Sequence, residues 1–578
     1  MRSWIPIALL AASGLTLASF SGVGVPGTLA LQASGEPSAV GQWSEPMDWP
    51  LVGVHAALLP TGKVLHYSYP QTGPGAEAWL WDPEGGTLGA APINRNIFCS
   101  SQAFLPDGRL LVTGGTDPGS PENTPFGLKD IHTFDPSAET WTHVADMQVG
   151  RWYPTSVALP DGRTLVVSGL DEQSNLTDLV EVYDPTSGSQ VIPGANRFLD
   201  LYPRMHVLPS GKVLHVGSEE LTSAFDPASA TWQEIGFSNY GYRGEGTSVL
   251  LPLQPPDYRA EVLTLGGGNP ATATAEIMAT GDPHPSWRFT ASMNQARRHP
   301  NAVLLPDGEV LVIGGGLTDE AESPILDAEI FDPVSETWSA VASMQRPRVY
   351  HSTAILLPDG RVLAAGSDGE YTAEIYSPPY LFQGSRPQMS SAPDATLYGG
   401  SFQVTTPDAQ DIASIVLIRP AAVTHSVNTD QRYVELEFEA GTDLVTVQAP
   451  PSANLAPPGY YMLFIVNSDG VPSEAMFIQL GSSIDSDNDG FSDAIELFVG
   501  TDENLACGPV AWPPDFNDDQ IVTISDVLAL KPAFNSQSDD PNYDSRLDLS
   551  ADGRITISDV LALRPVFNQS CAPSSPPG

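Results

Sequence analysis

Residues 105–115 read Leu-Pro-Asp-Gly-Arg-Leu-Leu-Val-Thr-Gly-Gly, which is a tight turn followed by an apolar run that ends in small residues. The same pattern, with Asp, Ser or Thr before the glycine of the turn, begins at Leu59, Leu105, Leu159, Leu208, Leu305 and Leu357. A seventh copy at Leu251-Pro252 has a longer turn before its second apolar run, and the seven prolines are 43 to 54 residues apart. Each copy predicts two antiparallel strands joined by an Asp-Gly type turn.

A second signal follows several of these turns about twenty residues later. It consists of an aromatic-Asp-Pro triplet and a tryptophan, as in Phe134-Asp135-Pro136 with Trp141, Phe225-Asp226-Pro227 with Trp232, and Phe331-Asp332-Pro333 with Trp338. A period near 50 with this signature is typical of kelch repeats, each of which forms one blade of a β-propeller. Seven copies predict a seven-bladed propeller over residues 43–384. A sandwich of similar hairpins does not explain a repeat kept from Pro60 to Pro358.

The composition agrees with an all-β chain and restricts its partners. The 578 residues include 52 Gly and 54 Pro, and only 16% are charged. Acidic residues number 69 and basic residues 25, which gives a net charge of −44. This excess argues against nucleic acid or an anionic membrane as partner, because phosphate groups are bound by Lys and Arg. The three cysteines leave one over if the other two form a disulfide.

The N-terminus, residues 1–33, predicts a signal peptide for export. Arg2 precedes an apolar stretch from Trp4 to Phe20, and small residues follow, with candidate cleavage points near Ala30 or Ala33. An N-terminal membrane anchor is the alternative, but small and polar residues interrupt the apolar run. Nothing later in the chain approaches the length of a membrane span. We therefore expect a secreted, extracellular protein that can keep disulfides, with cell-surface association left open.

Four residues depart from the repeat just before the inner strand of a blade, where the chain approaches the propeller axis. Cys99 precedes the second copy, Tyr153 the third, and Tyr350 and His351 the seventh. If they converge, their mixed nitrogen and oxygen ligands favour Cu(II) over zinc or calcium. Taken singly, a Tyr or Cys at this position usually packs, and a single His is usually hydrogen-bonded in a turn. The combination favours a metal site.

These motifs resemble the galactose oxidase/glyoxal oxidase family of copper radical oxidases. The resemblance is carried by Phe98-Cys99, Arg151-Trp152-Tyr153, Arg348-Val349-Tyr350-His351-Ser352, residues 423–432 around His425, and residues 458–464 and 467–473. It covers roughly residues 43–480. It implies an immunoglobulin-like β-sandwich over residues 385–480, for which we expect strands at Ser401 to Val404, Ser414 to Ile418, Tyr433 to Phe438 and Tyr461 to Val466. The loop around His425 would reach into the propeller.

The resemblance also implies a role for each site residue. Tyr153, His351 and His425 would be equatorial copper ligands, and Tyr350 would be the axial ligand and general base. Cys99 would be joined to the ring of Tyr153 by a thioether, which forms a one-electron radical cofactor. Copper and this radical would together oxidise a primary alcohol, an aldehyde or a carbohydrate with O2, and release H2O2. The alternative is a catalytically inactive kelch protein that binds a carbohydrate or another protein.

The substrate is less well determined by the sequence. Galactose oxidases carry a tryptophan stacked over the cross-linked tyrosine, in the loop that corresponds here to residues 168–172, which contain no tryptophan. Trp152 or a tryptophan from another blade is the candidate to shield the radical, and simple packing is the alternative for Trp152. No galactose-binding type domain fits between the signal peptide and Trp43. The layout therefore resembles glyoxal oxidase more than galactose oxidase.

The tail contains three acidic segments with the ligand spacing of calcium loops. The candidate ligands are Asp485, Asp487, Asp489, Asp493 and Glu496 in an Asp-rich linker over residues 481–506, then Asp515, Asn517, Asp519, Thr523 and Asp526, and finally Asp548, Ser550, Asp552, Thr556 and Asp559. The last two loops each precede Val-Leu-Ala-Leu and resemble a dockerin module over residues 507–578, which implies a cohesin-type partner. Gln520 replaces the usual loop glycine. A solvated acidic linker is the alternative. With Cys99 in the thioether, Cys507 and Cys571 are left to pair.

Overall fold

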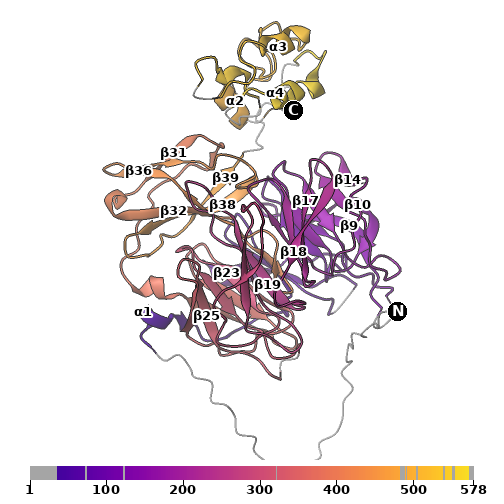
Figure 1. The fold of residues 1–578 in the computed structure, drawn as a ribbon, viewed down its shortest axis with the longest axis vertical. Coiled ribbons are helices and arrows are strands. Elements are labelled where there is room, and N and C mark those ends of the chain that lie inside the picture. Colours follow the sequence, from indigo (N-terminus) through magenta and orange to yellow (C-terminus); the bar gives the residue numbers. More distant parts are fainter. Residues whose placement is uncertain are drawn as a thin grey trace, which may run out of the picture.

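The computed structural model describes residues 35–71, 74–120, 124–319, 322–481, 489, 491, 493–502, 505–537, 540–549 and 554–571. The signal peptide predicted for residues 1–33 lies outside this range. Among the described residues, no helix is both long and apolar enough to cross a bilayer. Three bodies follow one another along the chain: a ring of sheets, a β-sandwich and a small helical module (Figure 1).

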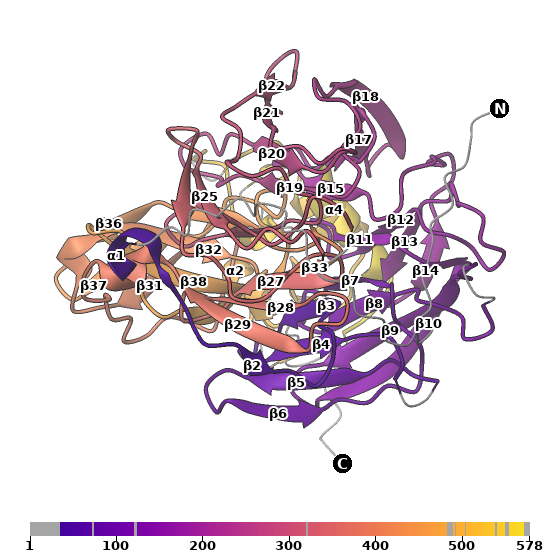
Figure 2. The ribbon, with the colours of Figure 1, turned by 90° about the horizontal axis from the view of Figure 1, so that it is seen from below.

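In the described part of the chain, seven antiparallel sheets follow the seven repeats in order, which confirms the predicted propeller (Figures 1 and 2). The first and second blades contain β3 (His55–Leu58), β4 (Val64–Tyr67), β5 (Ala78–Asp82) and β6 (Thr87–Ala90), then β7 (Ser101–Phe104), β8 (Leu110–Thr113), β9 (Leu128–Asp135) and β10 (Thr140–Arg151). The third and fourth contain β11 (Thr155–Ala158), β12 (Thr164–Val167), β13 (Glu181–Asp184) and β14 (Gly188–Val191), then β15 (Arg204–Val207), β16 (Val213–Val216), β17 (Leu221–Asp226) and β18 (Thr231–Phe237). The fifth and sixth contain β19 (Gly246–Leu250), β20 (Glu261–Gly266), β21 (Ala275–Ala279) and β22 (Arg288–Phe289), then β23 (Asn301–Leu304), β24 (Val310–Ile313), β25 (Ala328–Asp332) and β26 (Thr337–Val341). The seventh contains β27 (Ser352–Leu356), β28 (Val362–Gly366) and β29 (Thr372–Ser377).

The repeated turn joins the first two strands of a blade. Its glycine has a left-handed backbone in six copies, with φ of 86° at Gly108 and 88° at Gly308. Only glycine adopts this conformation without steric cost, which explains why the turn glycine recurs. The strands on either side are largely buried because each blade packs between two neighbours.

The tryptophan that follows the aromatic-Asp-Pro triplet connects its blade to the segment that leads into the blade. Trp141 lies opposite Phe134 across β9 and β10, with ring centroids 5.0 Å apart. Its indole Nε1 donates a hydrogen bond to the carbonyl of Ala91, in the segment that leads into the blade. Trp232 and Trp338 repeat both contacts in the fourth and sixth blades. The signature therefore marks an inter-blade contact.

The N-terminal segment closes the ring. The helix α1 (Pro37–Val40) leads into β1 (Gln42–Trp43), which pairs with β29 as the outer strand of the seventh blade. The strand β2 (Met47–Asp48) pairs with β29 as well. The blade that completes the circle is thus built from both ends of the propeller sequence.

The sandwich consists of two sheets. The larger has the order β30 (Ala395–Thr396), β39 (Met476–Leu480), β38 (Gly459–Asn467), β32 (Ile412–Ile418) and β35 (Tyr433–Leu436), and the smaller has β31 (Ser401–Thr405), β37 (Leu444–Gln448) and β36 (Phe438–Ala440). The short 3₁₀ turns η1 (Pro379–Phe382) and η2 (Ala409–Asp411) complete this part of the chain. The expectation of one strand from Tyr433 to Phe438 is wrong, because the chain changes sheets at Glu437 and forms β35 and β36 instead.

One hairpin leaves the sandwich and enters the propeller. Its strands are β33 (Ala422–Thr424) and β34 (Val427–Asn428). β33 pairs antiparallel with β3, the innermost strand of the first blade, so that Thr424 lies opposite His55. Figure 2 shows β33 beside β3 among the inner strands of the propeller. His425 follows β33 directly and is carried to the propeller axis by this pairing.

The tail forms a small module with α2 (Asp493–Val499), α3 (Ile524–Ala529), η3 (Ser545–Leu547), α4 (Ile557–Ala562) and η4 (Arg564–Val566). Its apolar core contains Phe491, Trp512 and Val522, among others. Cys507 and Cys571 are disulfide-bonded, with a Cα–Cα distance of 5.2 Å, which confirms the expected pairing. Cys99 is the free cysteine and is buried.

Candidate metal centre

The segment before the inner strand has the same backbone shape in six blades. One residue there has a left-handed backbone although it is not glycine: Cys99 (φ 61°), Tyr153 (62°), Tyr202 (47°), Glu245 (60°), His299 (55°) and His351 (64°). Such values are uncommon for residues with a Cβ atom and indicate a conformation held by its surroundings. The repeat thereby presents one side chain from each of these blades at an equivalent position.

The five residues of the predicted copper site lie together. Cys99, His351 and His425 each offer a ligand atom, and these atoms lie within 4.8 Å of one another. The hydroxyl groups of Tyr153 and Tyr350 form a hydrogen bond with each other. The Tyr153 ring lies 4.6 Å from the His425 ring, and the Tyr350 ring lies 3.8 Å from the His351 ring. Residues from three blades and from the inserted hairpin thus form one group.

The two imidazoles are oriented as metal ligands are. His351 Nδ1 hydrogen-bonds to Asp368 Oδ1 at 2.6 Å, and His425 Nδ1 to Thr424 Oγ1 at 2.6 Å. Both Nε2 atoms are buried and have no hydrogen-bond partner. A histidine whose second nitrogen is fixed by an oxygen atom is typical of metal sites. Burial also lowers the pKa of His425 well below its usual value, so this ring is neutral and has a free lone pair.

The two tyrosines require a cation before they can act as anionic ligands. Burial raises the pKa of both the Tyr153 and the Tyr350 phenols well above the usual value of 10. A positive charge beside a buried phenol has the opposite effect, because it stabilises the phenolate. Two phenols, two imidazoles with free nitrogen atoms and a thiol are a donor set that fits copper.

Cys99 and Trp152 both lie against Tyr153. Burial raises the pKa of the Cys99 thiol well above its usual value, and the interaction with the Tyr153 hydroxyl partly opposes this effect. The amide nitrogen of Cys99 donates to His55 Nε2 at 3.2 Å, which fixes the backbone at this point. The indole of Trp152 stacks on the Tyr153 ring, with centroids 3.6 Å apart and an angle of 9° between the planes. Trp152 is therefore the aromatic neighbour that covers one face of Tyr153.

Two further residues belong to this group, and the sequence analysis did not identify them. The Tyr202 ring lies 4.4 Å from that of Tyr153 and 4.6 Å from that of His425. The His299 ring lies 5.0 Å from that of Tyr350, and its Nε2 is 3.0 Å from Asp319 Oδ1. Both occupy the repeat position that Cys99 and Tyr153 occupy in their blades. Alignment of the seven repeats on the inner strand is the signal that identifies them.

The predicted calcium ligands are described only in part. Asp485, Asp487, Ser550 and Asp552 lie outside the described residues, and Asp493 is described only as the first residue of α2. Asp489 accepts a hydrogen bond from the Phe491 amide, and Glu496 is buried. The carboxylates of the other two loops that are fully buried or nearly so are Asp515, Asp526, Asp548 and Asp559. Buried carboxylates are usually paired or bound to a metal.

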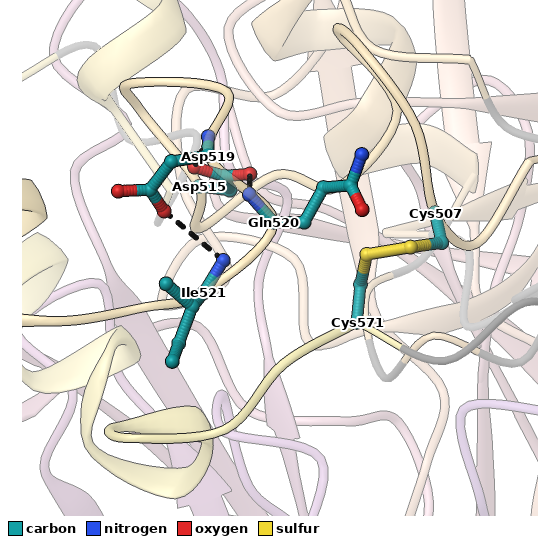
Figure 3. Close-up of a disulfide and its surroundings, with 6 residues drawn as sticks. All are labelled: Cys507, Asp515, Asp519, Gln520, Ile521 and Cys571. Carbon is teal, nitrogen blue, oxygen red and sulfur yellow. Dashed lines mark hydrogen bonds between the residues drawn. A yellow bond between two sulfur atoms is a disulfide. The ribbon is translucent and has the colours of Figure 1, made fainter.

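The first dockerin-like loop is folded around Asp515 (Figure 3). The amides of Asp519 and Gln520 donate to the two oxygens of Asp515, at 3.1 and 2.6 Å. The Asn517 side chain accepts from the Asp519 amide at 3.0 Å. Thr523 and Asp526 form a capping box at the start of α3. In the second loop, Asp559 accepts from the Thr556 amide at 2.8 Å.

Comparison with known proteins agrees with this geometry. A family model described as glyoxal oxidase N-terminus matches residues 69–380, a galactose oxidase-like early set domain matches residues 386–480, and a dockerin type I domain matches residues 513–567. The aldehyde oxidase GLOX of Vitis pseudoreticulata is 31% identical over 448 residues, which are 67% of this chain and 82% of that protein. Galactose oxidase of Gibberella zeae is 29% identical over 496 residues, which are 76% and 71% of the two chains.

A solved structure is similar over most of the chain as well. A fungal alcohol oxidase of the AA5 family, in complex with copper, superposes with a TM-score of 0.68 at 27% identity. The similarity covers 76% of this chain and 99% of the fungal one. The glyoxal oxidase model spans more than half of the sequence, and the propeller, the sandwich and the site group are all present. The chain therefore belongs to the galactose oxidase/glyoxal oxidase family of copper radical oxidases.

Proposed function

We propose that the protein is a secreted copper radical oxidase that oxidises primary alcohols or aldehydes with O2 and releases H2O2. The observation that carries the proposal is the group of Cys99, Tyr153, Tyr350, His351 and His425, in which both histidine Nε2 atoms are buried and lack a partner. The relatives of this chain include galactose, aldehyde and alcohol oxidases, which supports this class of reaction. A catalytically inactive kelch protein would not need two buried histidine Nε2 atoms without a hydrogen-bond partner.

Tyr153, Tyr350, His351 and His425 would hold the copper ion. A bound copper ion supplies a one-electron acceptor and a Lewis acid that lowers the pKa of the substrate hydroxyl. Tyr350 Oη accepts the hydroxyl proton, and the oxidised Tyr153 Oη accepts a hydrogen atom from the adjacent carbon. The substrate loses two electrons and two protons. O2 accepts these two electrons and two protons and becomes H2O2.

In the mature enzyme, Cys99 Sγ is bonded to the Tyr153 ring. The two residues are already neighbours, because the Tyr153 amide donates to the Cys99 carbonyl at 3.0 Å, and the thiol is buried and interacts with the Tyr153 side chain. An electron-donating sulfur on the ring makes a tyrosyl radical easier to form. Trp152, stacked on the same ring, excludes solvent from one face of that radical. This assigns to Trp152 the shielding role for which the loop at residues 168–172 has no tryptophan.

The C-terminal tail would attach the enzyme to a partner protein. We place the functional units at residues 43–384 for the propeller, 385–480 for the sandwich, 481–506 for the Asp-rich linker and 507–578 for the dockerin-like module. The dockerin type I match and the buried Asp515, Asp526, Asp548 and Asp559 support calcium binding and a cohesin-type partner. The disulfide between Cys507 and Cys571 supports an extracellular location.

Peroxide release tests the catalytic proposal. The copper-loaded full chain is incubated with a panel of primary alcohols, aldehydes and sugars, and H2O2 and O2 uptake are measured. We expect turnover that Cys99→Ser lowers strongly and that Tyr153→Phe abolishes. Tyr460→Phe, which changes a tyrosine of the sandwich, is the matched control and retains activity. Mass spectrometry of the peptides with Cys99 and Tyr153 should find them linked, with the loss of two hydrogen atoms.

Two results would contradict the proposal. Full turnover by Tyr153→Phe would exclude the radical mechanism, and unlinked peptides from an active enzyme would exclude the thioether. For the tail, calcium should be required for binding to a cohesin-type partner. If EGTA changes neither the folding of the module nor its binding, the calcium assignment is wrong.

A further inference from the structure

The second blade carries another group of metal-binding side chains, which shares no residue with the copper site. Asp130 on β9 and His143 and Asp146 on β10 each offer a ligand atom, and these atoms lie within 4.8 Å of one another. His143 Nε2 is 2.9 Å from Asp146 Oδ1. All three line an open pocket of about 930 Å³, which also contains His132.

The strand register explains why these residues meet. His132 lies opposite His143 and Asp130 lies opposite Asp146 in the antiparallel pairing of β9 and β10. Alternate residues of a strand point to the same face, so Asp130 and His132 share one face of the sheet. The pairing is irregular between His143 and Ala145, and this bulge lets His143 and Asp146 face the same side although they are three residues apart.

His132 adds an independent indication of a ligand. Only 7% of this residue is exposed, and its Nδ1 has no hydrogen-bond partner. Its ring lies 5.2 Å from the ring of His143, at an angle of 70°. A buried imidazole with an unused nitrogen therefore lines the pocket that the two carboxylates share.

The charges of the pocket favour a cation. Asp130 and Asp146 lie opposite each other, and like charges at opposite positions destabilise a sheet. Arg95 donates to both oxygens of Asp130, each at 2.7 Å, and compensates one of the two charges. Asp117, Glu139 and Glu172 also line the pocket, where Glu139 is paired with Lys63 and Glu172 with Lys129. The carboxylate of Asp146 is left with His143 as its partner.

We propose that Asp130, His132, His143 and Asp146 bind one divalent ion of the zinc class. Two imidazoles and two carboxylates are a four-ligand set that suits zinc, whereas calcium and magnesium prefer oxygen ligands alone. Tetrahedral zinc at 2.0–2.2 Å from its ligands needs ligand atoms roughly 3.3–3.6 Å apart. The group of Asp130, His143 and Asp146 therefore has to contract, and it has to do so toward His132, which lies outside that group. The side chains of His143 and Asp146 are 48% and 63% exposed, so both can rotate toward the ion when their mutual contact is replaced by bonds to the metal. The bound ion would connect β9 and β10 across the bulge.

Zinc titration of the full chain tests this site. The protein is first loaded with copper and saturated with calcium, so that its other metal sites are occupied, and Zn²⁺ binding is then followed by isothermal titration calorimetry. We expect one Zn²⁺ per chain and no loss of copper by elemental analysis. His143→Ala and Asp146→Asn should each weaken zinc binding at least tenfold. His284→Ala and Asp257→Asn change exposed residues of the same types elsewhere and should leave it unchanged.

X-ray absorption at the zinc edge gives a second readout. Two imidazole ligands with oxygen ligands are expected in the wild type. The proposal is overturned if the loaded protein takes up no zinc, if His143→Ala and Asp146→Asn keep the wild-type affinity, or if zinc enters only as copper leaves. A spectrum without imidazole scattering would overturn it as well.

Discussion

Arg151 shows how a single side chain positions the proposed copper site. It is fully buried and donates to Glu181 at 2.9 Å and to the carbonyl of Ser168 at 2.6 Å. The pairs Arg243–Glu276, Arg297–Glu329 and Arg348–Glu374 repeat this contact in three other blades, each shortly before a residue with a left-handed backbone. Loss of one partner from a buried ion pair costs about 3–5 kcal/mol, so these pairs hold the strained segments firmly. Trp152 and Tyr153 follow Arg151 directly.

Trp152 allows a test of radical shielding at the level of one residue. Because its indole covers one face of the Tyr153 ring, we expect the oxidised radical to decay at least tenfold faster in Trp152→Ala, at unchanged copper content. Trp152→Phe should give an intermediate lifetime. The decay is followed by the optical absorption of the radical and by electron paramagnetic resonance. Trp338→Phe, in a remote blade, is the control. An unchanged lifetime in Trp152→Ala would mean that Trp152 only packs.

The site residues differ in how far the sequence could predict them. Cys99, Tyr153, Tyr350 and His351 could be found because they depart from the repeat at one position, and His425 because its neighbours form a distinctive motif. Tyr202 and His299 occupy the same repeat position, yet nothing in their local sequence indicates which side chains they contact. Those contacts arise only when the ring closes and brings together blades that are distant in sequence.

At the scale of elements, strands could be predicted from the sequence where the turn that joins them adopts a single geometry. The Asp-Gly turn fixes its hairpin locally, so the inner strands of the blades were predictable. The change of sheets at Glu437 was not, because the alternation of apolar residues continues from Tyr433 to Phe438 and sheet membership depends on distant partners. The predicted calcium loops lie between these cases. Their ligand spacing is local, but one backbone position departs from the usual residue.

Gln520 occupies the loop position that departs from the usual residue. It has φ of 69°, where a loop of this kind ordinarily has glycine, and its amide donates to Asp515 Oδ2 (Figure 3). A left-handed conformation costs a residue with a Cβ atom about 1 kcal/mol relative to glycine. We expect Gln520→Gly to tighten calcium binding at this loop by roughly fivefold, which is about 1 kcal/mol. Calorimetric calcium titration of the full chain measures the effect.

A second variant controls for effects elsewhere in the module. Asp515→Asn removes one of the loop ligands and should weaken calcium binding to this loop with either residue at position 520. The explanation by backbone strain is wrong if Gln520→Gly binds calcium no more tightly than the wild type.

At the scale of the whole molecule, the proposed copper site depends on two closures of the chain. β1 completes the seventh blade, and the blade begins with the segment that carries Tyr350 and His351. β33 joins the sandwich to β3 and carries His425 to the axis. Arg419 strengthens this second link, because its guanidinium bonds Asp430 and also donates to the carbonyl of Phe104 in the second blade. A change far from the copper site can therefore alter the site through the ring.

Trp43 is the residue that tests closure of the ring. Its indole Nε1 donates to the carbonyl of Ala342 at 2.7 Å, its ring lies 5.0 Å from Tyr376, and β1 is only two residues long. Truncation of a buried tryptophan costs about 3–5 kcal/mol, so we expect Trp43→Ala to lower the free energy of unfolding of the propeller by that amount. Trp338→Ala is the matched control. It removes the equivalent indole hydrogen bond from the sixth blade, which is built from four consecutive strands. Urea unfolding measures both variants, and hydrogen exchange should show β29 opening in Trp43→Ala alone. Equal losses in the two variants, with β29 protected in both, would mean that Trp43 has no special part in holding the ring closed.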